Sequence, residues 1–223
     1  MTKKEVENKI KERFNKLSNI FPENIEKDDP RVQAILKFLG DIEGKKILDV
    51  GCGKGRFSKI LVDKKAVVTG IDLSDKLLEV AKKNIEDVNF VIGSTTNLKF
   101  QDNLFDCIIC IETLEHVPDT KKAVEEMLRV LKEGGKIIII DKNKLSLHDK
   151  LFLPNIFIKK YKELSNKWMY PKNFPFIEKW FFPIEIEKML SRYCRETKKE
   201  YLKDNNKKLF SIFNLFIAWK GIK

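Results

Sequence analysis

Residues 47–57 read ILDVGCGKGRF, an apolar run that ends in a glycine-rich loop and continues into a segment mixing basic and apolar residues. The apolar run is typical of a buried strand, and the segment after the loop is typical of an amphipathic helix. Glycines at such a junction let the backbone turn tightly and approach a ligand with no Cβ in the way. The stretch therefore predicts a strand–loop–helix unit with a ligand at its loop.

An acidic residue further along narrows the kind of ligand. Asp72 ends the next apolar run, 21 residues after Gly51, where a carboxylate can accept both hydroxyls of a ribose. A dinucleotide-binding loop reads G-x-G-x-x-G, but Arg56 occupies the third glycine position, and the spacing here is G-x-G-x-G. Asp49 stands two residues before the first glycine. This pattern favours a ligand that has a ribose and no pyrophosphate.

Apolar runs and amphipathic segments alternate on both sides of this unit. We expect strands at 45–50, 66–72, 88–93, 104–112 and 136–141, and helices at 3–18, 30–39, 56–63, 74–85 and 120–132. Near-continuous apolar strands separated by helices indicate a parallel sheet covered on both faces. We expect a further helix at 185–193, and strands at 197–202 and 209–219 that pair as an antiparallel hairpin across the polar turn 203–208.

Length and composition exclude several classes of protein. The chain has 223 residues, 43% hydrophobic and 35% charged, which is typical of a single globular domain over 1–223. Within it we expect N-terminal helices at 1–40, a ligand-binding core at 41–141, a substrate-recognition insert at 142–182, and the last helix and hairpin at 183–223. No apolar run reaches the roughly 20 residues of a membrane span, and the charged start MTKKEVENKIKERF lacks a signal-peptide region. Four cysteines do not make a disulfide framework, so we predict a cytoplasmic protein.

The positive charge and the aromatic residues gather near the C-terminus. Residues 142–223 carry 19 Lys and Arg against 8 Asp and Glu, which accounts for the whole net charge of +11. Ten of the 23 aromatic residues fall within 151–182. Such a segment suits an amphipathic or anionic substrate, peripheral contact with a membrane, or stacked nucleic-acid bases. The alternative is a lid whose aromatic side chains pack on the sheet while its lysines stay in solvent.

Four motifs in order resemble the class I S-adenosylmethionine-dependent methyltransferases: ILDVGCGKGRF, GIDLS, LFDCIICIETLEHVPD and RVLKEGGKIIIID. The resemblance covers residues 28–141 and the terminal hairpin. It implies an α/β fold with a seven-stranded, Rossmann-like sheet in the order 3-2-1-4-5-7-6 and helices on both faces. It also implies the cofactor S-adenosyl-L-methionine.

The resemblance further implies a set of cofactor-binding residues. The glycines of the loop would line the methionine part and the sugar, Asp49 would reach the amino group, and Asp72 would hold the ribose hydroxyls. Leu73 would lie against adenine. The family often has an acid after the third strand, which accepts from the adenine amino group, but Ser94 stands there in this chain and has no charge. The full implied set is Arg31, Asp49, Gly51, Cys52, Gly53, Gly55, Asp72, Leu73, Ser94, Thr95 and Ile111.

Glu112, Glu115 and His116 follow the fourth predicted strand, at the edge where ligands bind in such sheets. If the segment turns helically, the three share one face and offer two carboxylates and an imidazole to Mg, Mn, Fe or Zn. The segment is similar to the E-x-x-E-H metal site of the ubiquinone-biosynthesis O-methyltransferases, and Arg31 matches a cofactor-contacting arginine of that subfamily. A divalent metal there would lower the pKa of a phenol or a vicinal hydroxyl.

Two other interpretations of this segment stay open. His116 could act alone as a general base, or Glu115 and His116 could only shape the turn before the helix at 120. We predict methyl transfer to a small-molecule or lipid/glycan-type acceptor, at oxygen and with a metal, and take His116 and Glu112 as the catalytic residues. The alternatives are an RNA methyltransferase that uses the basic last third, and a non-catalytic subunit that only binds the cofactor.

Overall fold

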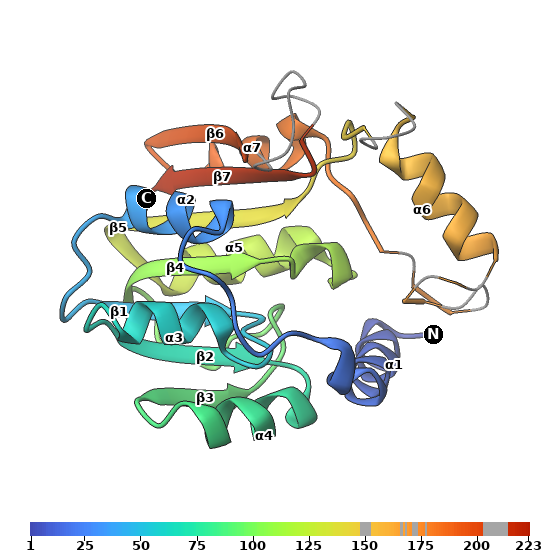
Figure 1. The fold of residues 1–223 in the computed structure, drawn as a ribbon. Coiled ribbons are helices and arrows are strands. Elements are labelled where there is room, and N and C mark those ends of the chain that lie inside the picture. The colour runs from blue at the N-terminus through green and yellow to red at the C-terminus, as the bar shows by residue number, and fades with distance from the viewer. Residues whose placement is uncertain (148–152, 166, 168, 171–173, 177, 203–213) are drawn as a thin grey trace.

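A seven-stranded sheet in the order β3-β2-β1-β4-β5-β7-β6 organises the molecule, which confirms the predicted order (Figure 1). The computed structural model describes residues 1–147, 153–165, 167, 169–170, 174–176, 178–202 and 214–223. Strands β1 to β5 run parallel, and β7 pairs antiparallel with both β5 and β6. The strands are β1 (Lys46–Val50), β2 (Val67–Asp72), β3 (Val88–Ile92), β4 (Phe105–Ile111), β5 (Leu131–Lys142), β6 (Glu196–Leu202) and β7 (Phe216–Ile222).

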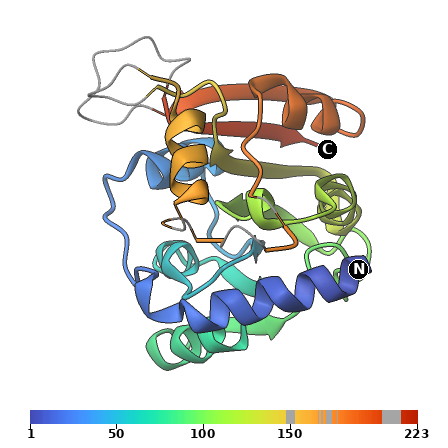
Figure 2. The ribbon, with the colours of Figure 1, turned by 90° about the vertical axis from the view of Figure 1, so that its right-hand side faces the viewer.

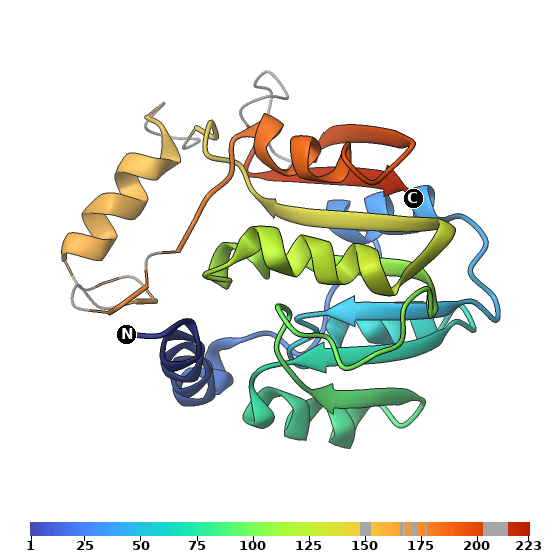
Figure 3. The ribbon, with the colours of Figure 1, turned by 180° about the vertical axis from the view of Figure 1, so that it is seen from behind.

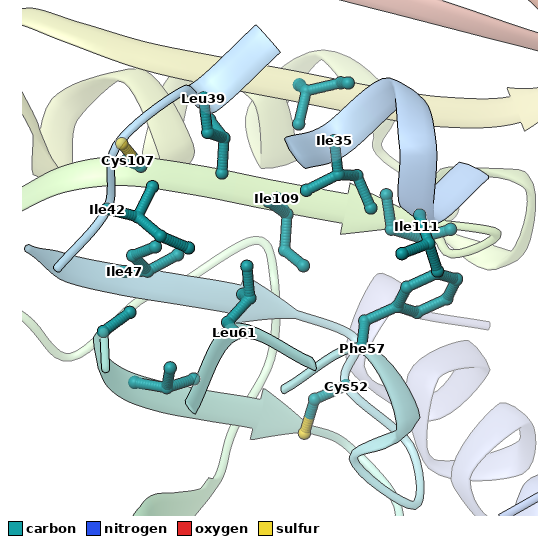
Figure 4. Packing of buried hydrophobic residues seen from close by; sticks show 14 of the residues in the cluster. Ile35, Leu39, Ile42, Ile47, Cys52, Phe57, Leu61, Cys107, Ile109 and Ile111 are labelled. Atoms are coloured by element: carbon teal, nitrogen blue, oxygen red, sulfur yellow. The ribbon is translucent and has the colours of Figure 1, made fainter. Parts of the chain in front are cut away.

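Helices cover both faces of the sheet, as predicted (Figures 1 and 3). Helices α2 (Pro30–Leu39), α3 (Arg56–Val62) and α4 (Asp75–Asn84) pack on one face, whose core is shown in Figure 4. Helices α5 (Thr120–Val130) and α7 (Pro183–Leu190) pack on the other. Cys107 belongs to the first core and Cys110 to the second, because residues three apart on a strand face opposite sides. All four cysteines are free and buried.

Several element bounds differ from the sequence-based ones. Strand β5 begins at Leu131, directly after α5, because Leu131 pairs with Phe105 ahead of a register shift between β4 and β5. The first predicted helix ends at Lys16, and a short 3₁₀ turn at Ser18–Ile20 follows it. The predicted turn at 203–208 and the start of the last predicted strand, 209–213, lie outside the described residues.

Helix α1 (Lys3–Lys16) crosses the carboxyl edge of the sheet (Figure 2). Near its start, Lys3 Nζ lies 2.5 Å from Asp119 Oδ2, beside the first turn of α5. Near its end, the Asn15 side chain accepts from Ser74 Oγ at 2.6 Å and donates to Asp75 Oδ1 at 2.6 Å. Between these anchors the apolar side of α1 packs with Tyr170 and Phe176. These contacts hold α1 over the edge where the sheet would bind a ligand.

Helix α6 (Asn155–Leu164) stands beyond that same edge, apart from the sheet (Figures 1 and 3). In the described part of the chain, no helix combines the length and the apolarity needed to cross a bilayer.

Candidate active site

A cavity lies between α1 and the carboxyl ends of the central strands. Glu7, Ile10 and Phe14 contribute from α1, and Met169 closes another side. Eleven residues predicted from the sequence line this one cavity: Gly51, Cys52, Gly53, Asp72, Leu73, Ser94, Thr95, Ile111, Glu112, Glu115 and His116. The cavity therefore brings most of the predicted cofactor residues together with the predicted catalytic residues.

The glycine loop is held in a backbone conformation that side chains disfavour. Gly51 has φ +74°, and a Cβ there would come within 2.2 Å of Thr113 Oγ1. Gly51 N and Cys52 N both donate to the carbonyl oxygen of Ile71, at 2.7 and 3.1 Å. Glycine at position 51 is therefore required by the positive φ and by the close approach of the β4 end.

Asp72 links the loop to the start of α4 while it faces the cavity. Its Oδ2 accepts from Gly53 N at 2.8 Å, and its Oδ1 accepts from Ser74 N at 2.8 Å. Burial raises the pKa of Asp72 above its usual value, although these backbone donors oppose the shift. Each carboxylate oxygen has more than one lone pair, so Asp72 can still accept from a bound polyol.

Three predicted cofactor contacts are not among the residues lining the cavity. Asp49 lies beneath the loop and accepts from Ser58 Oγ at 2.6 Å. Gly55 begins α3 with φ +79°, and a Cβ there would meet Ile85 at 2.8 Å and Phe90 at 2.9 Å. Arg31 binds Asp29 and Glu112. Their contacts with the cofactor stay predictions.

Glu112 follows β4 in a left-handed backbone conformation, with φ +50°. Its Oε2 contacts Arg31 Nη1 and lies 2.8 Å from Arg56 Nη2. The Arg31 guanidinium in turn lies over the ring of Phe216, 5.1 Å from its centroid. Two arginines therefore hold the Glu112 carboxylate, and its catalytic role stays a prediction.

Glu115 and His116 form a second, separate cluster at the cavity. Glu115 Oε1 accepts from Lys142 Nζ at 2.7 Å and lies 3.3 Å from His116 Nε2. His116 Nδ1 lies 3.0 Å from the Tyr170 hydroxyl, and Phe14 meets the imidazole edge-on at 5.0 Å between ring centroids. Burial alone would raise the pKa of Glu115, but Lys142 and His116 outweigh burial and lower it. An ionised, buried carboxylate therefore faces one nitrogen of His116.

The predicted metal ligands do not converge. Among the residues the structure describes, no three His, Cys, Asp or Glu side chains are grouped closely enough to hold a metal ion. Glu112 is directed at Arg31 and Arg56, whereas Glu115 is directed at Lys142, so each carboxylate already has a cationic partner. This donor set does not fit a divalent metal, and the metal prediction has no support from the geometry.

Sequence reasoning missed several residues of the cavity and its surroundings: Glu7, Phe14, Arg56, Lys142, Met169 and Tyr170. The aromatic content of 151–182 was a signal for Met169 and Tyr170, because that segment is predicted to recognise the substrate. The helical period of α1 was a signal for Phe14. No local sequence pattern indicated that Glu7, Arg56 or Lys142 belongs to the site, because their partners lie on other elements.

Comparison with known proteins finds a matching domain and named relatives over part of the chain. The model of the methyltransferase domain matches residues 48–139. The ubiquinone biosynthesis O-methyltransferase of Coxiella burnetii is 39% identical over 100 residues, which cover 43% of this chain and 43% of that protein. The demethylmenaquinone methyltransferase of Staphylococcus aureus is 35% identical over 144 residues, covering 62% of this chain and 59% of that protein. The chain thus spans about half the length of the curated relatives it matches.

A solved structure extends the likeness to the whole fold. An S-adenosylmethionine-dependent methyltransferase from Thermotoga maritima superimposes with a TM-score of 0.68 at 22% identity, covering 96% of this chain and 99% of that one. The matched domain, the strand order and the position of the glycine loop and Asp72 agree with one another. Residues 48–139 match a methyltransferase domain, and the chain has the fold of the class I S-adenosylmethionine-dependent methyltransferases.

Proposed function

We propose that this chain transfers a methyl group from S-adenosylmethionine to a hydroxyl of a small, amphipathic aromatic acceptor of the quinone-precursor type. One observation carries the proposal: a single cavity joins the glycine loop and Asp72 to the Glu115–His116 pair. The apolar lining on the His116 side, Phe14, Phe21 and Met169, suits an aromatic acceptor. The names of the two curated relatives, one for ubiquinone biosynthesis and one for demethylmenaquinone, support the acceptor class.

The residues present fit the cofactor. Asp72 faces the cavity with lone pairs available for ribose hydroxyls, and Gly51 and Gly53 leave the backbone open to close approach. When bound, the cofactor supplies an electrophilic methyl group on a sulfonium. The chain itself has to bind the two substrates in line, exclude water and remove one proton.

His116 is the residue that removes the proton. It receives a proton at Nδ1 by way of the Tyr170 hydroxyl, which passes its own proton to Nδ1 as it takes the proton of the acceptor's hydroxyl, while Nε2–H stays directed at Glu115. The Glu115 carboxylate stabilises the imidazolium that forms, and Lys142 keeps that carboxylate ionised. Phe14 covers the imidazole and limits the access of water. Glu112 and a metal are not needed for this route.

The aromatic insert at 142–182 is proposed to recognise the acceptor. Its helix α6 exposes Phe157, Tyr161 and Leu164, which are 64%, 66% and 56% exposed. These residues follow one another at helical spacing and share a face. We propose that this face contacts the membrane surface in which an amphipathic acceptor would reside.

The RNA alternative rests on the basic last third of the chain. Several of its lysines are already paired with acids of the same chain, namely Lys142, Lys159, Lys199, Lys220 and Lys223. These pairs lower the charge left for phosphates, so an RNA acceptor is kept as an outcome of the test.

Methyl transfer from radiolabelled S-adenosylmethionine into a native cell extract tests the proposal. The extract is incubated with and without EDTA and then separated into lipid, small-molecule, protein and RNA pools. We expect label in the lipid or small-molecule pool that persists with EDTA. Loss of that label with EDTA would restore the metal prediction, and label in RNA would replace the acceptor class.

A further inference from the structure

Helix α1 places one acidic side chain, Glu7, in the cavity. Its Oε1 accepts from Ser94 Oγ at 3.0 Å and from Thr96 Oγ1 at 2.9 Å. No donor from the described part of the chain reaches the other oxygen, Oε2. Glu7 is therefore oriented by two hydroxyls while one oxygen stays available for a ligand.

These hydroxyls lie one strand away from the ribose-binding acid. Asp72 at the end of β2 pairs with Ile92 at the end of β3, and Gly93 N donates to the Asp72 carbonyl oxygen at 3.0 Å. Ser94 follows directly, and Asp72, Leu73, Ser94 and Glu7 all line the same cavity. A nucleoside with its ribose on Asp72 and its base directed toward the end of β3 would bring an edge of that base to the side of the cavity that Ser94 and Glu7 line.

We propose that Glu7 accepts a hydrogen bond from the exocyclic amino group of adenine, and that it supplies the charge that Ser94 lacks. The assignment rests on the proposed function, since it takes S-adenosylmethionine as the ligand of this cavity. Adenine offers an amino donor at the position where hypoxanthine carries an oxo group. A carboxylate accepts from the first and repels the second, so Glu7 makes the site selective for adenine.

The anchoring of α1 gives Glu7 the fixed position that such recognition needs. Lys3 and Asn15 tie the helix to α5 and to the start of α4, on either side of Glu7. Ile10, one turn further along, is buried against Tyr170 and Phe176. A recognition residue on a helix fixed at both ends is held more tightly than one on a loop.

The test compares S-adenosylhomocysteine with S-inosylhomocysteine, which differs only in carrying hypoxanthine. Calorimetric titration of the wild-type chain should show the adenine form binding about 10-fold tighter or more, as expected of a hydrogen bond to a charged group. In Glu7→Gln the preference should fall below about 3-fold, because the amide can rotate to accept from an amino group or donate to an oxo group. Glu12→Gln, on the exposed side of the same helix, should keep the wild-type preference.

The ratio of the two affinities is measured on one preparation, so a partly misfolded variant lowers both signals and leaves the ratio unchanged. An unaltered preference in Glu7→Gln, with S-adenosylhomocysteine still bound, would overturn the Glu7 assignment and leave the proposed function standing. Failure of the wild-type chain to bind either nucleoside would overturn the proposed function and the assignment with it.

Discussion

The Tyr170 hydroxyl lies 3.0 Å from His116 Nδ1, although 54 residues separate the two in the chain. Tyr170 is buried beside Phe174 and Phe176, against the apolar side of α1. Burial raises the pKa of Tyr170, and the charges of Glu178 and Glu115 raise it further, so the phenol is a neutral donor. The insert between β5 and α7 therefore orients the imidazole from the side opposite Glu115, in addition to any contact with the acceptor.

This arrangement predicts that His116→Ala lowers the rate of methyl transfer about 100-fold to 10,000-fold, the usual effect of removing a general base. Affinity for S-adenosylhomocysteine should stay within about 3-fold, because His116 is placed on the acceptor side. Tyr170→Phe keeps the ring packing and removes the hydroxyl that relays the proton, so a loss of about 100-fold is expected. Initial rates of label transfer to the acceptor pool measure the rate losses of both variants, and calorimetric titration measures the affinity for S-adenosylhomocysteine.

The matched control is Tyr161→Phe, which removes a hydroxyl from an exposed tyrosine of α6. Its rate with a freely soluble acceptor should equal that of the wild type. A His116→Ala enzyme of wild-type rate would rule out the proton-transfer role and favour the interpretation that His116 only shapes the turn.

Asp72→Ala should weaken S-adenosylmethionine binding about 10-fold or more, since it removes a charged acceptor from the cavity. The same change also frees Gly53 N and Ser74 N, which now donate to Asp72. Asp63→Ala, at an exposed acid just after α3, controls for the loss of a negative charge. Equal affinities of the two variants in a calorimetric titration would mean that the cofactor binds elsewhere.

Asn15→Ala should speed the release of S-adenosylhomocysteine, because Asn15 fastens one end of α1 to Ser74 and Asp75. Two hydrogen bonds of about 1 kcal/mol each correspond to a dissociation rate raised about 10-fold or more. Stopped-flow displacement measures that rate directly. Lys16→Ala, the exposed neighbour, should leave it unchanged, and a wild-type rate in Asn15→Ala would show that α1 does not have to move for release.

Local patterns predicted the sheet and the loop because each depends on residues close together in the chain. The parallel strands, the positive φ at Gly51 and the place of Asp72 follow from apolar runs, a glycine and a spacing, whereas the strand order was implied by the resemblance to the class I methyltransferases. The direction of the Glu112 carboxylate could not be predicted from such local patterns. Helical spacing was assumed for 112–116, but Glu112 takes a left-handed conformation and the 3₁₀ turn begins only at Leu114. Its carboxylate is thereby directed to Arg31 and Arg56, on α2 and α3, and away from Glu115.

Contacts between distant elements could not be predicted from the sequence, because local patterns do not determine them. Ser94 donates a hydrogen bond to Glu7, which lies 87 residues away in the chain, and Lys142 donates one to Glu115, which lies 27 residues away. No periodicity links such pairs, since they are fixed by how α1 and β5 pack against the rest of the fold. The aromatic density of the insert predicted that it recognises the substrate, but not which ring would reach His116.

The burial of the Asp49 carboxyl group leads us to expect that the stability of the fold depends on pH. It is fully buried beneath the glycine loop, and burial, with a further effect of the Asp72 charge, raises its pKa from 3.8 to about 7. The folded state therefore binds this proton more tightly than the unfolded state does. The contribution of Asp49 to stability is greatest below about pH 4 and is lost as the pH rises toward 7, by an amount on the order of 4 kcal/mol.

Asp49→Asn should remove that loss, because the amide is neutral at every pH and its oxygen can still accept from Ser58. Urea unfolding at pH 5 and at pH 8 measures the change for both chains. The wild type should lose more stability than the variant between these two values, and the other carboxylates contribute nearly equally to both. Asp63→Asn, at an exposed acid, should behave as the wild type does. Parallel pH profiles for the wild type and Asp49→Asn would show that Asp49 stays ionised beneath the loop, as it would if a cationic group or water reached it there.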